Sequence, residues 1–326
     1  MSVRNVRPWR QRGVAVITAL LLTTLAISIV ASLFWQQQVQ VRSIENQRLQ
    51  LQKQWILRGA LDWASLILRA DAATSSVDHL GEPWAVPLAD TRLDEYVENG
   101  RSDADASDAT LSGGIIDAQS RYNLSNLASG GTVNPVEVAT FQRLLGLLQL
   151  NPALAQATAD AVAAGQTKPT SGGAGNSAVS TVSDAQSGSR PMAFEYVQDL
   201  LAVPGFNVEM VNKLKDYVTI LPNPTPINVN TASPEVLAAQ IDKLSLTDAA
   251  ALTAGRDSGV YFRSISDFNS QLASRTSAAT PANISVVTNY FLVNGKVQLS
   301  RAAMDMQALI ERTSNRSTKV IWIRED

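Results

Sequence analysis

The 326-residue sequence predicts an α+β fold, in which a long N-terminal helix packs on a small antiparallel sheet with a large inserted helical domain. Two observations predict this class. Residues 14–34 form an apolar run without charge, Pro or Gly, and a helical pattern continues from it to about residue 70. Strand patterns lie on both sides of a helical block, so the segments that flank the block are expected to pair in one sheet.

The first element is a helix that begins in a membrane. Residues 14–35 reach the length of about 20 apolar residues that a bilayer-spanning helix needs. Residues 36–70 are amphipathic, so one face is expected to lie on a globular head, with Trp55 and Trp63 in the core. The preceding stretch has basic residues and no acid, which predicts a cytoplasmic N-terminus and an exported remainder. Those basic residues are Arg4, Arg7, Arg10 and Arg12.

Gly13 separates a basic leader, residues 1–13, from the apolar run. A protease that works at the membrane face needs an unbranched residue before the cut, and Gly13 provides it. The run is longer than the apolar region of about 7–15 residues in a secretory signal peptide. An uncleaved signal anchor stays open as the alternative, because a glycine before an apolar helix is common.

The composition excludes several classes of function. The net charge is −2 and the pI is about 5.6, so no global field attracts nucleic acid. The absence of Cys excludes disulfides, thiol catalysis and Cys-type zinc sites. His79 is the one histidine, which excludes a two-histidine metal site.

The helical block divides into two predicted units, residues 126–225 and 226–285. In the first, helices are expected after Asn134-Pro135 and after Asn151-Pro152, and a further helix–turn–helix follows within 194–222. A Gly/Ser/Thr-rich stretch, 166–189, predicts a flexible loop. In the second unit, Thr231 or Ser233 can N-cap a helix that has Pro234 in its first turn.

The head is predicted from two segments, residues 71–125 and 286–326. A strand with a turn is expected over 111–124. Two short strands around Asn294-Gly295 are predicted as a hairpin, since this dipeptide favours a two-residue hairpin turn. A last strand is expected over 318–324.

Several motifs, taken in this order, resemble the type IV pilin-like proteins and, within them, the type II secretion system protein K family of minor pseudopilins. The matching stretches are RGVAVITALLL after the leader, VDHLGEPWA at 77–85, SRYNLSNL at 120–127, PINVNTASPEVLAA at 226–239 and KVIWIR at 319–324. The resemblance implies a pilin-like fold whose inserted domain has two SAM-like or helix-hairpin-helix-like units. It also implies that a prepilin peptidase cleaves after Gly13 and methylates the amine of Val14.

Thr18 is the fifth residue after the implied cut, where most pilin-like proteins have Glu. In this family the Glu is characteristically missing. An unpaired carboxylate in a membrane is costly, and a subunit with nothing above it has no neighbouring amine to pair with. The Thr18 hydroxyl is expected to bond to a backbone carbonyl one turn earlier. A merely tolerated helix residue is the alternative.

The resemblance implies a role in assembly rather than catalysis. It places the subunit at the pseudopilus tip, bound to the minor pseudopilins GspI and GspJ, with GspH and the major pseudopilin GspG below. There it would initiate and cap a pseudopilus that exports proteins across the outer membrane. The implied location is the inner membrane of a Gram-negative bacterium, with one span and the bulk in the periplasm. The insert, about 127–283, would obstruct a subunit stacking above.

A signal-anchored periplasmic DNA receptor of the ComEA type is the alternative function. The second helical unit resembles the helix-hairpin-helix of such receptors, which bind phosphates through backbone N–H groups of a Gly-x-Gly hairpin. The hairpin at 242–248 has no glycine and two acids. We therefore expect no nucleic-acid binding.

Calcium is the one cofactor that the resemblance suggests, held by acids of the inserted helical domain. Calcium takes six to eight oxygen ligands, often from several carboxylates. The matching stretch retains only Asp184, with Asp160 upstream, so these are weak candidates. A second acidic cluster is interpreted as a solvated loop. It consists of Asp103, Asp105 and Asp108.

His79, with Asp78 and Glu82, is the one group that suggests hydrolysis. The sequence has no Gly-x-Ser-x-Gly nucleophile elbow to accompany it. A structural loop anchored by Trp84 and hydrogen-bonded through His79 is the favoured interpretation. We expect no enzymatic activity.

Overall fold

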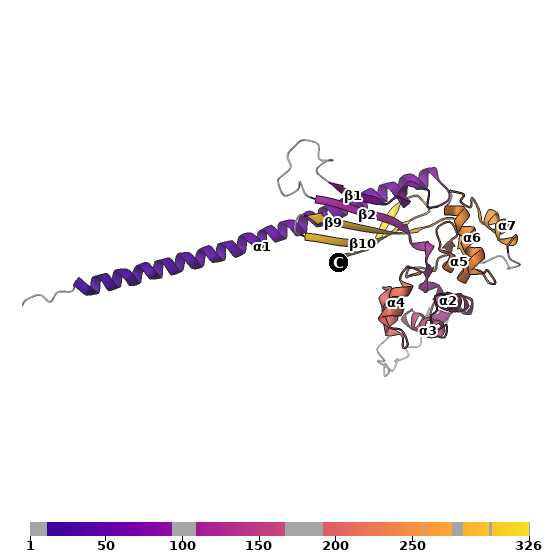
Figure 1. Cartoon of the computed structure of the whole chain (residues 1–326), viewed down its shortest axis with the longest axis horizontal. Coiled ribbons are helices and arrows are strands. Elements are labelled where there is room, and N and C mark those ends of the chain that lie inside the picture. The colour runs from indigo at the N-terminus through magenta and orange to yellow at the C-terminus, as the bar shows by residue number, and fades with distance from the viewer. Residues whose placement is uncertain are drawn as a thin grey trace, which may run out of the picture. The chain divides into compact units, whose positions relative to one another are not determined.

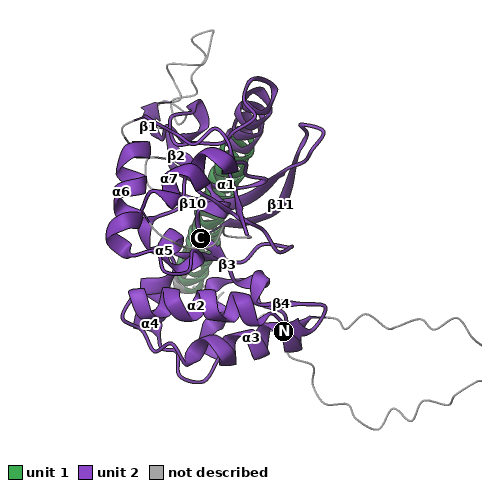
Figure 2. Cartoon of the chain, turned by 90° about the vertical axis from the view of Figure 1, so that its right-hand side faces the viewer, with its two compact units in different colours: residues 1–58 green, residues 59–326 purple. Residues whose placement is uncertain are grey.

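The computed structural model describes residues 12–92, 109–166, 192–257, 259–275, 283–299 and 302–325. The chain separates into two compact units, residues 1–58 and 59–326 (Figure 2). Several predictions fall outside the described residues. They concern residues 1–11 of the leader, the loop 166–189 beyond Gln166, and the acids Asp103, Asp105, Asp108 and Asp184.

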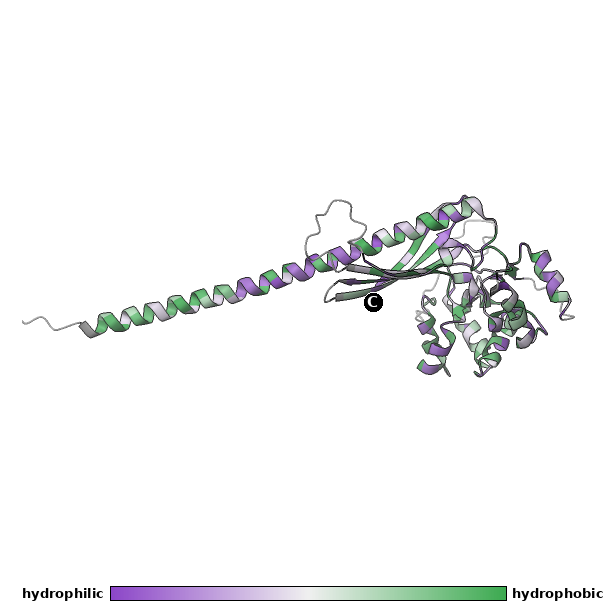
Figure 3. Ribbon diagram, turned by 45° about the horizontal axis from the view of Figure 1, so that its top comes forward, coloured by the Kyte–Doolittle hydropathy of each residue, from purple (hydrophilic) through white to green (hydrophobic). Residues whose placement is uncertain are grey.

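Helix α1, Arg12–Thr74, is continuous, as the uninterrupted helical pattern predicts (Figure 1). In the first unit, residues 14–34 are exposed on every side, and Figure 3 shows the mostly hydrophobic colouring of this part. Thr23 and Ser28 donate their hydroxyls to carbonyl oxygens within the helix at 2.8–3.0 Å. These hydroxyls are therefore satisfied within the helix, as a membrane requires.

The last part of α1, residues 59–74, belongs to the second unit and is amphipathic. Leu61, Ala64 and Leu68 are buried at helical spacing and form its inner face. The expectation that Trp55 and Trp63 lie in the core is wrong, since they are 68% and 50% exposed. The small and aliphatic residues provide the packed face, because a helix of period 3.6 turns Trp63 away from them.

The sheet has five antiparallel strands in the order β1-β2-β9-β10-β11. Figure 1 labels β1, β2, β9 and β10, and Figure 2 labels β11. Its strands come from both sides of the helical block, as predicted. The strand expected over 111–124 is β2, and the last expected strand is β11. Their bounds are β1 Leu88–Arg92, β2 Ala109–Asp117, β9 Tyr290–Leu299, β10 Ala302–Arg312 and β11 Thr318–Glu325.

The predicted hairpin at Asn294-Gly295 is wrong, because both residues lie inside the continuous strand β9. Gly295 pairs with Gly113 of β2 on one side and with Met306 of β10 on the other. A Cβ on Gly113 would lie 2.2 Å from the carbonyl oxygen of Asn294. The glycines therefore serve close backbone approach between neighbouring strands rather than a turn.

Strand β10 was not predicted. Its sequence, AAMDMQALIER, consists mostly of residues that favour helices. The strand pairs with β9 along one edge and with β11 along the other. Tertiary pairing on two sides thus overrides local propensity.

The inserted block is helical, as predicted, and shares one apolar core that includes Leu124, Phe141, Leu237 and Phe268. Two parallel strand pairs join its segments, β3 with β6 and β7 with β8. Its helices are α2 Pro135–Leu147, α3 Leu154–Gly165, η5 Val197–Ala202, α4 Val208–Leu214, α5 Pro234–Gln240, α6 Leu246–Asp257 and α7 Ile265–Ala273. The short strands are β3 Tyr122–Asn123, β4 Ala128–Ser129, β5 Thr132–Val133, β6 Val218–Thr219, β7 Ile227–Asn228 and β8 Ile284–Ser285.

The helix starts follow the expected capping chemistry. The side chain of Asn134 accepts from the N–H of Val136 at 3.1 Å and begins α2. Of the two candidates for the cap of α5, Ser233 provides it. Thr231 instead donates its hydroxyl to Asp117, which places it in the polar network described below.

Candidate functional site

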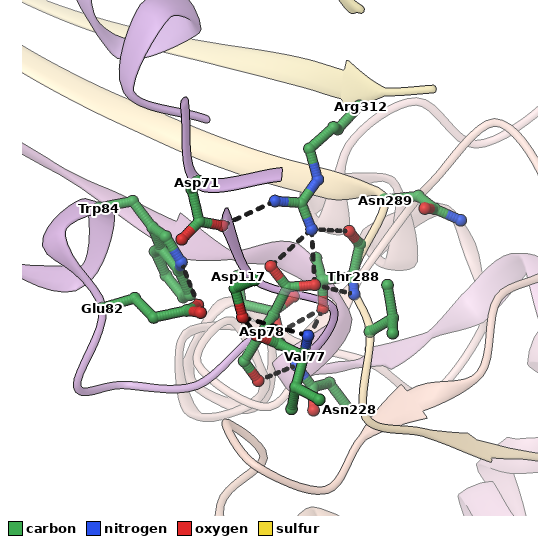
Figure 4. Close-up of polar contacts among 12 residues, drawn as sticks. Asp71, Val77, Asp78, Glu82, Trp84, Asp117, Asn228, Thr288, Asn289 and Arg312 are labelled. Atoms are coloured by element: carbon green, nitrogen blue, oxygen red, sulfur yellow. Dashed lines mark hydrogen bonds and ion pairs between the residues drawn. The ribbon is translucent and has the colours of Figure 1, made fainter. Parts of the chain in front are cut away.

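Two parts of the chain are of functional interest: the N-terminal end of α1, which holds Gly13, Val14 and Thr18, and a buried cluster of the second unit. We call this cluster the polar junction. It consists of Asp71, Asp78, Asp117, Asn228, Thr288 and Arg312 (Figure 4). The first part has an exposed apolar surface. The polar junction forms hydrogen bonds and ion pairs between distant segments of the chain.

Gly13 and Val14 lie in the first turn of α1, which begins at Arg12. Thr18 follows one turn later and donates its hydroxyl to the carbonyl oxygens of Val14 and Ala15, both at 3.0 Å. This is the backbone bond predicted for Thr18, and it satisfies the hydroxyl within α1. Among the described residues, α1 is the one helix with the length and composition to cross a membrane.

Arg312, the last residue of β10, is the central cation of the polar junction. Its Nη1 donates to Asp71 Oδ2 at 2.9 Å, near the end of α1. Its Nη2 donates to both carboxylate oxygens of Asp78, at 2.5 and 2.6 Å, and to the Thr288 carbonyl at 2.9 Å. The guanidinium group therefore ties α1, the loop after it and the sheet together, which its fixed fork of donors allows.

Asp117, the last residue of β2, links the head to the inserted domain. Its Oδ2 accepts from the hydroxyls of Thr231 and Thr288, at 2.5 and 2.6 Å, and from Asn228 Nδ2 at 2.9 Å. Its Oδ1 accepts from the N–H of Gln119 at 2.7 Å. Because Thr231 and Asn228 belong to the inserted block, these bonds fix the position of that block on the sheet.

Burial shifts the acids of the polar junction toward their neutral form. Desolvation raises the pKa of Asp71 from 3.8 to about 6, helped by the charges of Glu82 and Asp78 and opposed by Arg312. Desolvation likewise raises the pKa of Asp117 to about 6 against its four hydrogen bonds. The pKa of Asp78 is raised by burial as well, with Arg312 the largest opposing influence.

The loop that holds His79 is anchored by Trp84 and hydrogen-bonded through His79, as predicted. Glu82 Oε2 accepts from Trp84 Nε1 at 2.7 Å and from the N–H of His79 at 3.0 Å. The His79 ring stacks on Tyr261 with centroids 3.8 Å apart. Its Nδ1 accepts from the N–H of Gly81, and its Nε2 faces Glu82 Oε1 at 3.8 Å. Both ring nitrogens thus face the loop's own atoms, and within the part of the chain that the structure describes neither bonds to a hydroxyl nucleophile as a triad requires.

The hairpin at 242–248 has a geometry that disfavours phosphate. Ser245 caps α6 by accepting from the N–H of Asp248 at 3.1 Å, and it donates to the carboxylate of Asp248 at 2.6 Å. A carboxylate in the first turn occupies the electropositive end of the helix, where a phosphate would bind.

The described acids of the inserted domain do not fit the implied calcium. Asp160 is exposed on α3, and its carboxylate accepts from Gln156 Nε2 at 2.9 Å within the same helix. Among the described residues, it joins no group of three His, Asp or Glu side chains. One carboxylate cannot supply the oxygens that calcium takes.

Sequence reasoning found part of the polar junction without recognising it. Asp78 lies in the stretch 77–85 and Asn228 in the stretch 226–239, both of which carry the family resemblance. A third such stretch, 120–127, holds Asn123, which lies outside the polar junction and donates its amide to the Asn223 carbonyl and to the Thr225 hydroxyl. No local signal marked Arg312, Asp71 or Asp117.

Comparisons with known proteins agree with these motifs. Two family models described as type II secretion system (T2SS) protein K match residues 120–223 and 227–287, which together make up half of the chain. Type II secretion system protein K of Pseudomonas aeruginosa is 29% identical over 327 residues, covering 95% of this chain and 92% of that protein. The Aeromonas hydrophila protein of the same name is 26% identical over 260 residues, or 74% of each chain.

A solved structure shares the fold. The match is to a chain in the crystal structure of the GspK-GspI-GspJ complex from the enterotoxigenic Escherichia coli type 2 secretion system. The TM-score is 0.61 at 19% identity, and the match covers 87% of this chain and 99% of that one. Nothing in these comparisons supports the alternative of a DNA receptor. The chain belongs to the type II secretion system protein K family, the minor pseudopilins that its sequence motifs resemble.

Proposed function

We propose that this protein is a membrane-anchored subunit at the tip of the pseudopilus, where it initiates and caps assembly for protein export. The observation that carries the proposal is the exposed apolar surface of α1 before residue 35, on a chain whose other end carries a folded head with a bulky helical insert. Such a surface requires cover from lipid or from neighbouring helices. The insert would leave no room for another subunit above it.

Processing at Gly13 would convert the anchor into an assembly helix. A prepilin peptidase cleaves after Gly13 and methylates the new amine of Val14. Glycine supports this because it gives the peptidase access to the backbone, and the Arg-rich leader holds the bond at the cytoplasmic surface. The remaining helix then leaves the inner membrane, with the bulk of the chain in the periplasm.

Thr18 supports the tip position. Its hydroxyl is satisfied by carbonyl oxygens of α1 itself, so the position calls for no amine of a neighbouring subunit. We propose GspI and GspJ as the direct partners, since the structural neighbour forms a complex of those three proteins. GspH and the major pseudopilin GspG follow below. The partners bury the exposed side of α1, and the mechanism is assembly rather than catalysis.

The test is co-expression of the full chain with a prepilin peptidase, followed by mass spectrometry of the product. Cleavage should remove the 13-residue leader, and Gly13→Val should block it because a branched side chain crowds the scissile bond. Gly59→Val, the same change at a glycine of α1 with no neighbour within 4 Å, is the matched control and should be cleaved normally. An intact N-terminus in the unmodified chain, or a cut near Ser28, would refute the proposal.

The partner assignment is tested separately by co-purification in detergent. The processed chain should elute with GspI and GspJ as one complex and should not bind DNA at low salt. Elution of the chain alone under conditions where GspI and GspJ associate would contradict the tip assignment.

A further inference from the structure

Three buried carboxylates of the head share a single positive charge. Asp71, Asp78 and Glu82 are 7%, 1% and 5% exposed, and Arg312 forms ion pairs with the first two. With all three acids ionised, this group has a net charge of −2. Buried charges are usually paired or coordinate a metal, and within the described part of the chain two negative charges of this cluster have no counter-charge.

The two carboxylate oxygens of Glu82 differ in their hydrogen bonding. Its Oε2 accepts two hydrogen bonds, from Trp84 and from the backbone of His79. Its Oε1 is buried and has no hydrogen-bond partner among the described residues, and the His79 Nε2 lies 3.8 Å from it. An unpaired buried carboxylate oxygen carries a full desolvation cost. The described residues therefore leave this oxygen open to a ligand.

The positions of the acids suit one small cation. One oxygen from each of the three carboxylates lies within 4.8 Å of the others. Oxygen ligands of Ca²⁺ lie about 2.3–2.6 Å from the ion, so ligands on opposite sides of it are about 5 Å apart. A single ion can thus touch all three carboxylates.

We propose that Asp71, Asp78 and Glu82 bind one divalent cation, Ca²⁺ in preference to Mg²⁺. The ion supplies the two missing positive charges and a partner for Glu82 Oε1. Ca²⁺ accepts several carboxylates in a flexible geometry, whereas Mg²⁺ demands strict octahedral geometry and retains water. Because Asp71 belongs to α1, and Asp78 and Glu82 to the loop after it, the ion holds the end of α1 against that loop.

This site is separate from the acids of the inserted domain. Asp160 lies on α3, and the three ligands proposed here lie on the head (Figure 4). Trp84 provides a specific probe, because its indole nitrogen is 2.7 Å from Glu82 Oε2. A Tb³⁺ ion bound by Glu82 would lie close enough to this indole for light absorbed by Trp84 to excite terbium emission.

The experiment titrates Tb³⁺ into the chelator-treated full chain in detergent at pH 7, with excitation of tryptophan. Saturable emission with one ion per chain is expected, and Ca²⁺ should displace it. Glu82→Gln should weaken Tb³⁺ binding about 10-fold or more, because it removes a charged ligand. Asp160→Asn, the matched control, should leave the titration unchanged. Trp84→Phe should lower the emission while Ca²⁺ still stabilises the chain.

Thermal unfolding gives a second readout that does not depend on emission. At about 100 times its Kd, Ca²⁺ should raise the Tm of the unmodified chain by about 5 °C or more. Without the ion, Glu82→Gln should unfold at the same or a higher temperature, because it removes an uncompensated charge, and Ca²⁺ should then add little. Equal Ca²⁺ stabilisation of the Glu82→Gln variant, or no binding to the unmodified chain at millimolar Ca²⁺, would overturn the proposal.

Discussion

The first part of α1 and the polar junction have opposite distributions of side chains. Residues 14–34 expose apolar side chains on every side, whereas the polar junction buries three carboxylates and a guanidinium group. Large apolar surfaces and buried charges are both unusual in a folded protein. The junction has most of its partners within the chain, whereas residues 14–34 pack against none of the described residues of their own unit. Residues 14–34 therefore provide a surface for contact with other molecules, and the polar junction holds elements of the second unit together.

This difference predicts opposite responses to similar substitutions. Removing a charge should be costly in the polar junction, because the partner charges stay buried. Adding a charge should be costly in the apolar part of α1, because lipid cannot solvate it. The largest effects on stability and on membrane anchoring are therefore expected from removing the charge of Arg312 and from adding a charge at Leu22.

Arg312→Leu should have the largest effect on stability. It leaves Asp71 and Asp78 buried without their counter-charge, which costs about 3–5 kcal/mol for a broken buried ion pair. Urea unfolding followed by tryptophan fluorescence measures this cost. Arg263→Leu, a change at an exposed arginine, is the control and should alter stability by less than about 0.5 kcal/mol.

A multiple-mutant comparison shows whether the cost comes from the stranded carboxylates. Adding Asp71→Asn and Asp78→Asn to Arg312→Leu should recover part of the lost stability, because no buried charge is then unpaired. If the triple variant is less stable than Arg312→Leu by the sum of the separate effects, the charges do not act as one group.

Leu22→Arg should have the next largest effect, on membrane anchoring. A charge near the centre of a membrane helix costs about 2.5–3.5 kcal/mol on insertion scales. Carbonate extraction of membranes should find more of the variant in the soluble fraction. Leu51→Arg makes the same change in the amphipathic part of α1 and should extract like the unmodified chain. Equal extraction of both variants would show that residues 14–34 do not anchor the chain in the membrane differently from the amphipathic part of α1.

Local patterns predicted the elements that depend on local chemistry. The continuous α1 follows from an uninterrupted helical pattern, and the start of α2 from the capping side chain of Asn134. The wrong hairpin at Asn294-Gly295 shows the limit of this reasoning. The same glycine that favours a turn also permits close strand pairing, and only the partner Gly113 distinguishes the two.

The polar junction could not be predicted, because its bonds join residues that are distant in the sequence. Arg312 and Asp71 are 241 residues apart, and Asp117 and Thr288 are 171 apart. No periodicity links such residues, and an isolated Asp or Arg in a sequence is usually exposed. The motif stretches around Asp78 and Asn228 marked the region. The bonds that these residues form could be identified only from the folded structure.

The raised pKa values of Asp71 and Asp117 predict a smaller, pH-dependent effect. Both rise from 3.8 to about 6, so the folded state binds more protons than the unfolded state between these values. The stability due to this shift is full below pH 3.8 and is lost as the pH rises through 6. Lowering the pH from 7.5 to 5 in the presence of a chelator should raise the unfolding free energy by about 1–3 kcal/mol.

Asp117→Asn distinguishes the contribution of Asp117 to this pH dependence from that of Asp71. The neutral side chain resembles the protonated acid, so the variant should lose about half of the stabilisation between pH 7.5 and pH 5. The amide nitrogen faces donors from Asn228, Thr231 and Thr288, so the variant should also be less stable at every pH. An unchanged pH profile would show that Asp117 does not titrate in this range.

Thr18→Glu should have the smallest effect on the stability of the fold. It tests directly whether the amine of a neighbouring subunit is available to position 18. Position 18 lies near the start of α1, remote in sequence from the head, so the unfolding free energy of the head should change by less than about 0.5 kcal/mol. If the subunit has nothing above it, the new carboxylate meets no amine and should not improve association with GspI and GspJ. Thr18→Val, which removes the internal hydroxyl bonds without adding charge, is the control. Tighter association or a more interior position in cross-linked pseudopili for Thr18→Glu would show that an amine is available, and the exposed helix would then have a neighbour on both sides.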